Sequence, residues 1–320
     1  MNNILINEVL NKNKNYLTQK REYLFNNFFK YLDVSAKTVE TYSKALRQMF
    51  KYFSEHGVNN PNREDIIFFK KDLEERNLKH TTIALYLASA RRFFAWCEAT
   101  GIYANIATGI KAPRIDSGHK KDCLSATQIK EILGEMKAGF LNPLPLEEKL
   151  RNYAILTLIT TCGLRTVEIT RANVEDMRNV AGVTCLYIQG KGRTDKSEFV
   201  KITEPVEKAI REYLKTRGNV KGNEPLFTSC SKRNYGGRLT TRTISGICKQ
   251  AMKKAGFNSP LLTAHSLRHS AVTLALIAGE SLSDVQAFAR HKSLNTTMIY
   301  AHNVNRLKSL CEQSISNAIF

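Results

Sequence analysis

A polar stretch in the first half of the chain divides its hydrophobic pattern into two parts. Residues 111–122, "KAPRIDSGHKKD", contain Pro113 and Gly118 among mostly charged and polar side chains. Proline and glycine interrupt helices and strands, so such a stretch is typical of a linker, which we place at residues 113–122. Because 320 residues also exceed what one hydrophobic core usually supports, we expect two domains.

The part before the linker has the periodicity of helices. Three segments, "SAKTVETYSKALRQMFKYFSEHG", "REDIIFFKKDLEERN" and "HTTIALYLASARRFFAWCEATG", repeat apolar residues at steps of three and four. Gly57 is an expected helix end, and Thr81 is an expected N-cap. We therefore predict a compact helical domain at residues 21–112. The Asn/Lys-rich residues 1–20 are predicted to form a disordered N-terminal extension.

Residues 123–320 are predicted to form a mixed domain. Ser125 can cap a helix, and "LEEKLRNYAILTLITTCG" is a strongly apolar helix that ends at Gly163. The β-branched runs "VTCLYIQ" and "SEFVKIT" flank "GKGRTDK", a pattern typical of a hairpin. The expected fold class is mainly α with a small β-sheet (α+β).

Charge and cysteine usage restrict the partners and the compartment. The net charge of +19 favours a polyanionic partner, and nucleic acid is the commonest. Seven cysteines without a CxxC pair favour a reducing compartment over a disulfide framework. We find no apolar run that suits a signal peptide or a membrane span, so a cytoplasmic protein is expected.

Several short stretches carry residues that suit phosphoryl transfer without a metal. Two arginines can neutralise the charge that grows on a phosphodiester, a tyrosine can attack its phosphorus, and a lysine can protonate the leaving oxygen. Each residue alone has an ordinary structural explanation, such as a solvated arginine or a helix-capping histidine. The stretches "TCGLRTVEI", "QGKGRTDK", "AHSLRHS" and "HKSLNTTMIY" supply Arg165, Lys191, His265, Arg268, His291 and Tyr300.

Two histidines one helical turn apart raise the alternative of a metal site. His265 and His269 have the i, i+4 spacing of a zinc pair. Residue 266 is Ser rather than the Glu of an HExxH motif, and no third ligand is evident. We therefore expect no metal and no cofactor.

The order and spacing of these motifs resemble the tyrosine recombinases, the phage-integrase and Xer-type superfamily. The resemblance runs from about residue 33 to residue 316 and includes the helical N-terminal part, which is similar to the family's core-binding domain. It implies that the two domains form a clamp around DNA. It also implies these roles: Tyr300 as nucleophile, Arg165 and Arg268 as phosphate ligands, Lys191 as general acid, His265 and His291 as assisting histidines, and Glu168 as a support for neighbouring groups.

The same resemblance implies the reaction and its assembly. The expected activity is site-specific DNA recombination through a 3′-phosphotyrosyl intermediate and a Holliday junction, without ATP or metal. Four protomers are expected to act on two double-stranded DNA sites. The apolar stripe of the C-terminal segment, with Val304 and Ile315, is expected to dock into a neighbouring protomer. The alternative is that this stripe folds back on its own core.

One position departs from the family pattern. Family members usually have Leu-Gly before the second histidine, whereas this chain has Ala289 and Arg290. Arg290 lacks the backbone freedom of glycine. It either adds a phosphate contact or only alters the local turn, and the sequence leaves both interpretations open.

The biological role and the DNA contacts depend on weaker signals. We expect an integrase of a mobile element, with Xer-type resolution of chromosome or plasmid dimers as the alternative. A relaxing enzyme like topoisomerase IB and a non-catalytic DNA-binding protein are the rivals from other classes. A nucleoid-associated location in the cytoplasm follows from DNA as the partner. Charge and position alone suggest the DNA-binding candidates Arg91, Arg92, Lys232, Arg233, Arg238 and Arg242.

Overall fold

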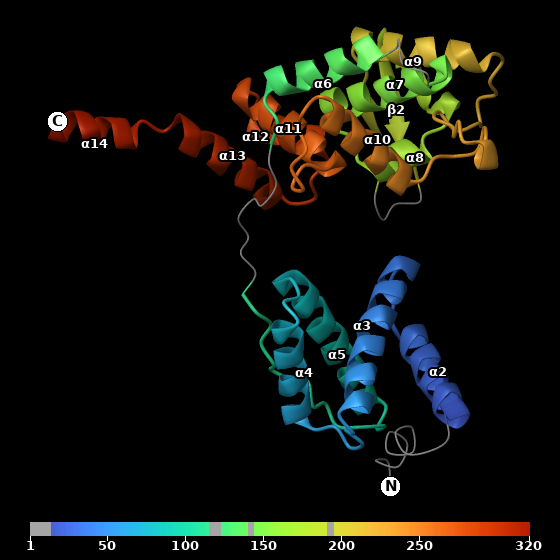
Figure 1. Cartoon of the computed structure of the whole chain (residues 1–320), viewed down its shortest axis with the longest axis vertical. Coiled ribbons are helices and arrows are strands. Elements are labelled where there is room, and N and C mark those ends of the chain that lie inside the picture. Colours follow the sequence, from blue (N-terminus) through green and yellow to red (C-terminus); the bar gives the residue numbers. More distant parts are fainter. Residues whose placement is uncertain (1–13, 115–122, 140–143, 191–194) are drawn as a thin grey trace. The chain divides into compact units, whose positions relative to one another are not determined.

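The computed structural model describes residues 14–114, 123–139, 144–190 and 195–320. The chain separates into two compact units, residues 1–118 and 119–320, each of which has its own hydrophobic core. In the described residues the fold is mainly helical with a three-stranded sheet, as the sequence predicted (Figure 1). No helix in these ranges is both long and apolar enough to cross a membrane.

The first unit is built from helices that bury aromatic side chains. Phe28, Phe53, Phe69 and Phe93 are each fully buried in its core. Their burial stabilises the unit because large aromatic side chains remove much apolar surface from water. The described helices of this unit are α2 (Lys14–Tyr31), α3 (Ala36–Glu55), α4 (Arg63–Glu75) and α5 (His80–Ala99).

Two local predictions for the first unit differ from the structure. Helix α2 begins at Lys14, so the last part of the predicted N-terminal extension is helical, while residues 1–13 lie outside the described residues. Thr81 is not the N-cap of α5, because Lys79 already occupies that position. Lys79, with φ of −58° and ψ of 137°, makes no side-chain cap hydrogen bond, so α5 begins without the capping side chain that the sequence predicted.

Among the described elements, the second unit carries the sheet and most of the helices. The predicted cap at Ser125 is confirmed, since its side chain accepts the N–H of Gln128. The predicted helix end at Gly163 is confirmed as well. The helices are α6 (Ala126–Ala138), α7 (Leu146–Cys162), α8 (Thr166–Arg171), α9 (Glu204–Arg217), α10 (Thr241–Lys254), α11 (Ala264–Ile277), α12 (Leu282–Ala289), α13 (Leu294–Lys308) and α14 (Cys311–Ile319).

The sheet has the strand order β1-β2-β3 and is antiparallel throughout. Strands β2 (Val183–Ile188) and β3 (Glu198–Lys201) form the predicted hairpin, in which Leu186 pairs with Val200. The sequence did not predict β1 (Met177–Val180), a short strand with mostly exposed side chains. The fully buried Leu186 joins the sheet to the core of the helices.

The C-terminal helix has no buried residue. Figure 1 shows α14 standing away from α11 and α12 of the same unit. Leu310, Ile315 and Ile319 are 71%, 59% and 66% exposed. Val304, at the start of the predicted stripe, is buried at 5% exposure, so in this structure only the first part of the stripe packs on its own unit.

Candidate active site

A turn at Gly163, at the end of α7, positions Arg165, the first of the two predicted arginines. Gly163 has φ of 58°, and a Cβ atom there would lie 3.0 Å from the Phe288 ring. Both the backbone geometry and the space therefore favour glycine. Arg165 follows as the extended residue before α8, and its side chain is 26% exposed. The turn leaves this guanidinium partly accessible.

The second predicted arginine is buried in α11. Arg268 is 3% exposed, and its guanidinium donates hydrogen bonds to the backbone carbonyls of Gly163 and Ala289. Burial, followed by repulsion from Arg165 and Arg290, lowers the pKa of Arg268 to about 9. The guanidinium still carries its charge at neutral pH. Arg268 thus links the turn after α7 to the end of α12.

Both arginines and His265 meet at one cavity of about 300 Å³. His265 is exposed near the start of α11, and its ring meets that of His269 edge to face with centroids 4.2 Å apart. Two cations and an imidazole around one hollow suit a phosphodiester, because guanidinium donors stabilise negative charge on its oxygens. The lining consists of Leu164, Arg165, Thr166, Val167, Ser245, Thr263, Ala264, His265 and Arg268.

The predicted nucleophile is buried against two histidines. Tyr300, on α13, is 5% exposed, and its hydroxyl is hydrogen-bonded to Nδ1 of His269. The phenol ring stacks on the rings of His269 and His291 with centroids 5.0 and 5.9 Å apart. Tyr300 is not among the described residues that line the cavity of Arg165 and His265. Its hydroxyl contacts an imidazole instead.

The environment of Tyr300 makes its phenol a weak acid. Burial raises its pKa to about 12, although Arg268 and Arg165 act in the opposite direction. Nearby cations favour the ionised form of a phenol. Their effect has the expected sign, but burial outweighs it.

His291 lies in the turn between α12 and α13. Its Nδ1 is 3.0 Å from Thr297 Oγ1, within hydrogen-bonding distance. Burial, followed by repulsion from Arg268, Arg165 and Arg290, lowers the pKa of His291 to about 4. The ring is therefore neutral at neutral pH and can form hydrogen bonds without adding charge to the site.

Glu168 is fully buried in α8 and is held on both carboxylate oxygens. Oε1 accepts from Arg165 Nη1 at 2.7 Å, and Oε2 accepts from the Arg165 backbone N–H at 2.8 Å. Oε2 also accepts from Arg290 Nη2 at 3.0 Å. Burial opposes ionisation, but Arg290 and Arg165 outweigh it and lower the pKa of Glu168. These contacts suit the predicted role of supporting its neighbours.

Arg290 has the left-handed conformation that the family's glycine would adopt easily, with φ of 52° at the end of α12. Its side chain is 5% exposed. Nη1 donates to the Phe288 carbonyl at 2.7 Å, and Nη2 donates to the Gly163 carbonyl at 3.0 Å as well as to Glu168. The side chain is therefore turned inward onto Glu168 rather than outward to a ligand.

Lys191, the predicted general acid, lies outside the described residues. The flanking strands β2 and β3 pair as expected. The role of Lys191 therefore stays a prediction.

The candidate DNA-binding arginines occupy different surroundings. Arg91 and Arg92 are exposed on α5, where they line a hollow together with Tyr42. Arg242 is exposed on α10. The Arg238 side chain instead forms hydrogen bonds within the protein. Its Nη1 donates to the backbone carbonyls of Thr170 and Ala172, at the end of α8, at 2.8 and 3.2 Å. Contact of any of these residues with DNA stays a prediction.

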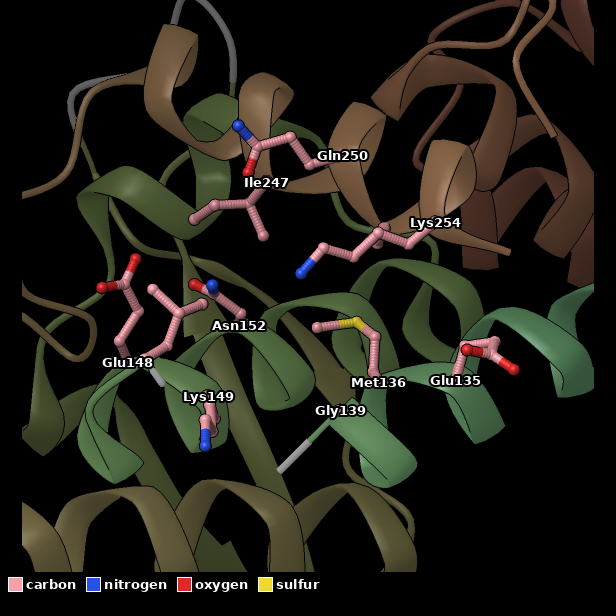
Figure 2. A pocket seen from close by; sticks show the side chains of 11 residues that line it. Glu135, Met136, Gly139, Glu148, Lys149, Asn152, Ile247, Gln250 and Lys254 are labelled. Atoms are coloured by element: carbon pink, nitrogen blue, oxygen red, sulfur yellow. The ribbon is translucent and has the colours of Figure 1, made fainter. Parts of the chain in front are cut away.

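A second cavity, of about 370 Å³, lies between α6, α7 and α10. Figure 2 shows Gln250 and Lys254 of α10 on one side of it and Glu148 and Asn152 of α7 on another. Among the described residues that line it, none is a predicted site residue. We therefore assign the chemistry to the cavity lined by Arg165, His265 and Arg268.

The sequence did not reveal the contact between His269 and the nucleophile. From the sequence, His269 stands out only as a possible metal partner of His265. Two signals could have identified it: it follows Arg268 directly, and it lies one turn after His265 on the same helix. In the structure, His269 is 6% exposed and is hydrogen-bonded to the Tyr300 hydroxyl.

Two family models match the chain. The model of the phage integrase family matches residues 122–306, and the model of the phage integrase N-terminal SAM-like domain matches residues 25–101. The tyrosine recombinase XerC of Syntrophus aciditrophicus is 30% identical over 316 residues, which cover 91% of this chain and 96% of the relative.

Solved structures share the fold. The XerH site-specific recombinase bound to its difH substrate aligns with a TM-score of 0.68 and 24% identity, over 84% of this chain and 78% of that one. The integrase of transposon Tn1549, in complex with transposon right end DNA, aligns with a TM-score of 0.67 and 16% identity, over 89% and 97%. Because the integrase model covers more than half of the chain and the XerC relative covers nearly all of it, the chain belongs to the phage integrase family of tyrosine recombinases.

Proposed function

We propose that this chain is a site-specific DNA recombinase that cuts and rejoins double-stranded DNA through a covalent link between Tyr300 and a 3′ phosphate. The observation that carries the proposal is the cavity lined by Arg165, Arg268 and His265, next to the pair of His269 and Tyr300. Membership of the family supports the same reaction.

In the proposed cleavage step, the Tyr300 oxygen bonds to phosphorus while the bond from phosphorus to the 5′ oxygen breaks. The phenol proton passes to His269, whose imidazole is already hydrogen-bonded to the phenol hydroxyl. A base is needed because the pKa of Tyr300 is about 12. Lys191 protonates the leaving oxygen, the two arginines bear the charge of the transition state, and His265 and His291 assist.

Strand exchange follows when the free 5′ hydroxyl of a partner duplex attacks the phosphotyrosyl link. The energy of the broken phosphodiester is kept in that link, so the exchange proceeds through a Holliday junction without ATP. We propose that the two units clamp the duplex and that four protomers hold two sites. The exposed apolar residues of α14, Ile315 and Ile319 among them, support docking onto a neighbouring protomer.

Two biological roles fit this chemistry. We propose integration of a mobile element, which the departure at Arg290 and the shared fold with the Tn1549 integrase support. Xer-type resolution of chromosome or plasmid dimers is the second candidate. The identity to XerC over almost the whole length of both chains favours that role.

Sequencing the DNA that becomes covalently attached to the protein in cells tests the function and the role together. Recombination predicts one defined cleavage site, which Tyr300→Phe no longer captures. A site at the end of a mobile element supports integration, whereas a single chromosomal site supports dimer resolution. Capture without site preference, together with relaxation of plasmids that lack the site, indicates a topoisomerase IB-like enzyme. No capture at all indicates a non-catalytic DNA-binding protein.

A further inference from the structure

The turn before His291 has a local energetic cost that a glycine would avoid. Arg290 has φ of 52°, and this left-handed backbone conformation is energetically unfavourable for residues that have a side chain. Its Nε is also buried without a hydrogen-bond acceptor among the described residues. An unpaired buried donor is unfavourable as well. Such strain persists only where other contacts enforce it, and it is common at functional sites.

Besides its bond to the Phe288 carbonyl, Arg290 makes contacts that lead to Arg165, the first arginine of the site. The Arg290 guanidinium bonds to the Gly163 carbonyl at the start of the turn that carries Arg165, and to Glu168 Oε2. In return, the Arg290 carbonyl accepts a hydrogen bond from Arg165 Nη2 at 3.2 Å. The backbone and the side chain of Arg290 therefore both contact the pair of Arg165 and Glu168.

We propose that Arg290 is a positioning residue for strand cleavage, which acts by holding the Glu168 carboxylate so that this carboxylate fixes the Arg165 guanidinium at the cavity. Arg290 itself is not among the described residues that line the cavity of Arg165 and His265, and both of its Nη atoms donate to groups of the protein. The inference rests on the proposed function, since DNA cleavage is the reaction that Arg165 would assist.

The charge of Arg290 also affects the titration of the site. Burial lowers the pKa of His291 most, and Arg268 on α11, Arg165 before α8 and Arg290 itself lower it further. The Tyr300 ring of α13 stacks on the same imidazole. Glu168 faces the guanidiniums of Arg165 and Arg290, which lower its pKa as well. Removal of one cation raises both pKa values. Protonation of the site then begins at a higher pH, so the acid limb of the cleavage profile moves upward.

A matched pair of substitutions isolates the charge of Arg290 at constant backbone strain. Arg290→Lys keeps a cation that can reach Glu168, whereas Arg290→Met has a side chain of similar length without charge. We measure single-turnover formation of the covalent adduct between pH 5 and 9, with a duplex that contains the cleavage site as substrate. Arg290→Met is expected to cleave at least about tenfold more slowly, with its acid limb at higher pH and its DNA affinity within about threefold of wild type. Arg290→Lys is expected to recover most of the rate.

Three results would overturn the inference. Cleavage by Arg290→Met within about twofold of wild type at every pH means that the charge has no role. Equal losses in Arg290→Lys and Arg290→Met contradict the inference, because a cation that reaches Glu168 would then restore nothing. Wild-type cleavage by Arg290→Gly, in which the left-handed turn is relaxed, means that Arg290 serves the turn alone.

A measurement without DNA separates this inference from the proposed function. If the wild type forms no adduct, the proposed function fails, and the link between Arg290 and Glu168 is judged by urea unfolding. Arg290→Met, Glu168→Gln and the double variant form a double-mutant cycle. Coupling that changes the unfolding equilibrium constant by about tenfold is expected. Additive effects within about twofold contradict the coupling on which the inference depends.

Discussion

The hydroxyl of Tyr300 is hydrogen-bonded to Nδ1 of His269, and the two rings stack with centroids 5.0 Å apart. Helix α13 thereby holds the nucleophile against α11, the helix that also carries Arg268. The Tyr300 hydroxyl thus has a proton acceptor within hydrogen-bonding distance. Tyr300 is, however, not among the described residues that line the cavity of Arg165, His265 and Arg268. For attack on a phosphate in that cavity, we expect Tyr300 to move toward it when DNA binds.

Replacement of His269 is expected to slow cleavage while DNA binding is retained. His269→Phe keeps a ring that stacks on Tyr300 but removes the proton acceptor. General-base catalysis typically contributes about 10²–10⁴-fold, so the rate of adduct formation is expected to fall by at least about a hundredfold. His269→Asn, which keeps a polar atom near the position of Nδ1, is the matched control and is expected to retain more activity. Equal rates for His269→Phe and the wild type would remove His269 from the mechanism.

The burial of His291 predicts a loss of stability in mild acid. Its pKa is about 4 in the folded protein, compared with 6.5 for an unperturbed histidine. Between these values the unfolded chain binds a proton that the folded chain does not, so stability decreases as pH falls from about 6.5 to about 4. Thermal unfolding midpoints across this range should fall more steeply for the wild type than for His291→Gln. Parallel curves for the two proteins contradict the predicted protonation state.

Arg165→Ala and Arg268→Lys are expected to reduce cleavage far more than DNA affinity. Their contacts with the phosphate strengthen as charge builds up in the transition state, and loss of one such donor typically costs about 2.7–4 kcal/mol in the barrier. Arg268→Lys is preferred to alanine because Arg268 also supports the carbonyls of Gly163 and Ala289. Adduct formation and equilibrium binding are measured on the same duplex. Cleavage by either variant within a few-fold of wild type assigns that arginine a structural role.

Lys191→Ala is expected to be rescued when the leaving 5′ oxygen is replaced by sulfur. A thiolate leaves without the proton that Lys191 is proposed to donate. If Lys191 only contacts a phosphate, the losses on the oxygen and sulfur substrates will be equal, and binding will weaken with a changed salt dependence. The comparison needs both substrates with both proteins. An undiminished defect on the sulfur substrate excludes the role of general acid.

Local sequence signals predicted the elements that position the site. The apolar run before Gly163 and the cap at Ser125 are short-range patterns, and the structure confirms both. The hairpin of β2 and β3 follows from two β-branched runs around a glycine-rich turn. Strand β1 was missed because its exposed side chains carry no hydrophobic alternation, and its formation depends on pairing with β2.

The contacts inside the site were beyond the sequence because they join distant parts of the chain. The bond from Tyr300 to His269 depends on how α13 packs against α11. Likewise, no local pattern shows that Arg290 turns inward to Glu168, a residue more than a hundred positions earlier. The motifs predicted which residues belong to the site, whereas tertiary packing decides which of them contact one another.

The central claim is that Tyr300 forms a covalent bond to DNA, and adduct formation measures it most directly. Wild type and Tyr300→Phe are incubated in EDTA with a duplex nicked beside the cleavage site, so that the released fragment cannot rejoin. We expect a denaturation-resistant protein–DNA species for the wild type, with the nucleotide mapped to Tyr300 by peptide mass spectrometry, and none for Tyr300→Phe, which retains DNA binding. An adduct formed by Tyr300→Phe at the wild-type level, or strict dependence of the wild type on magnesium, would contradict the account.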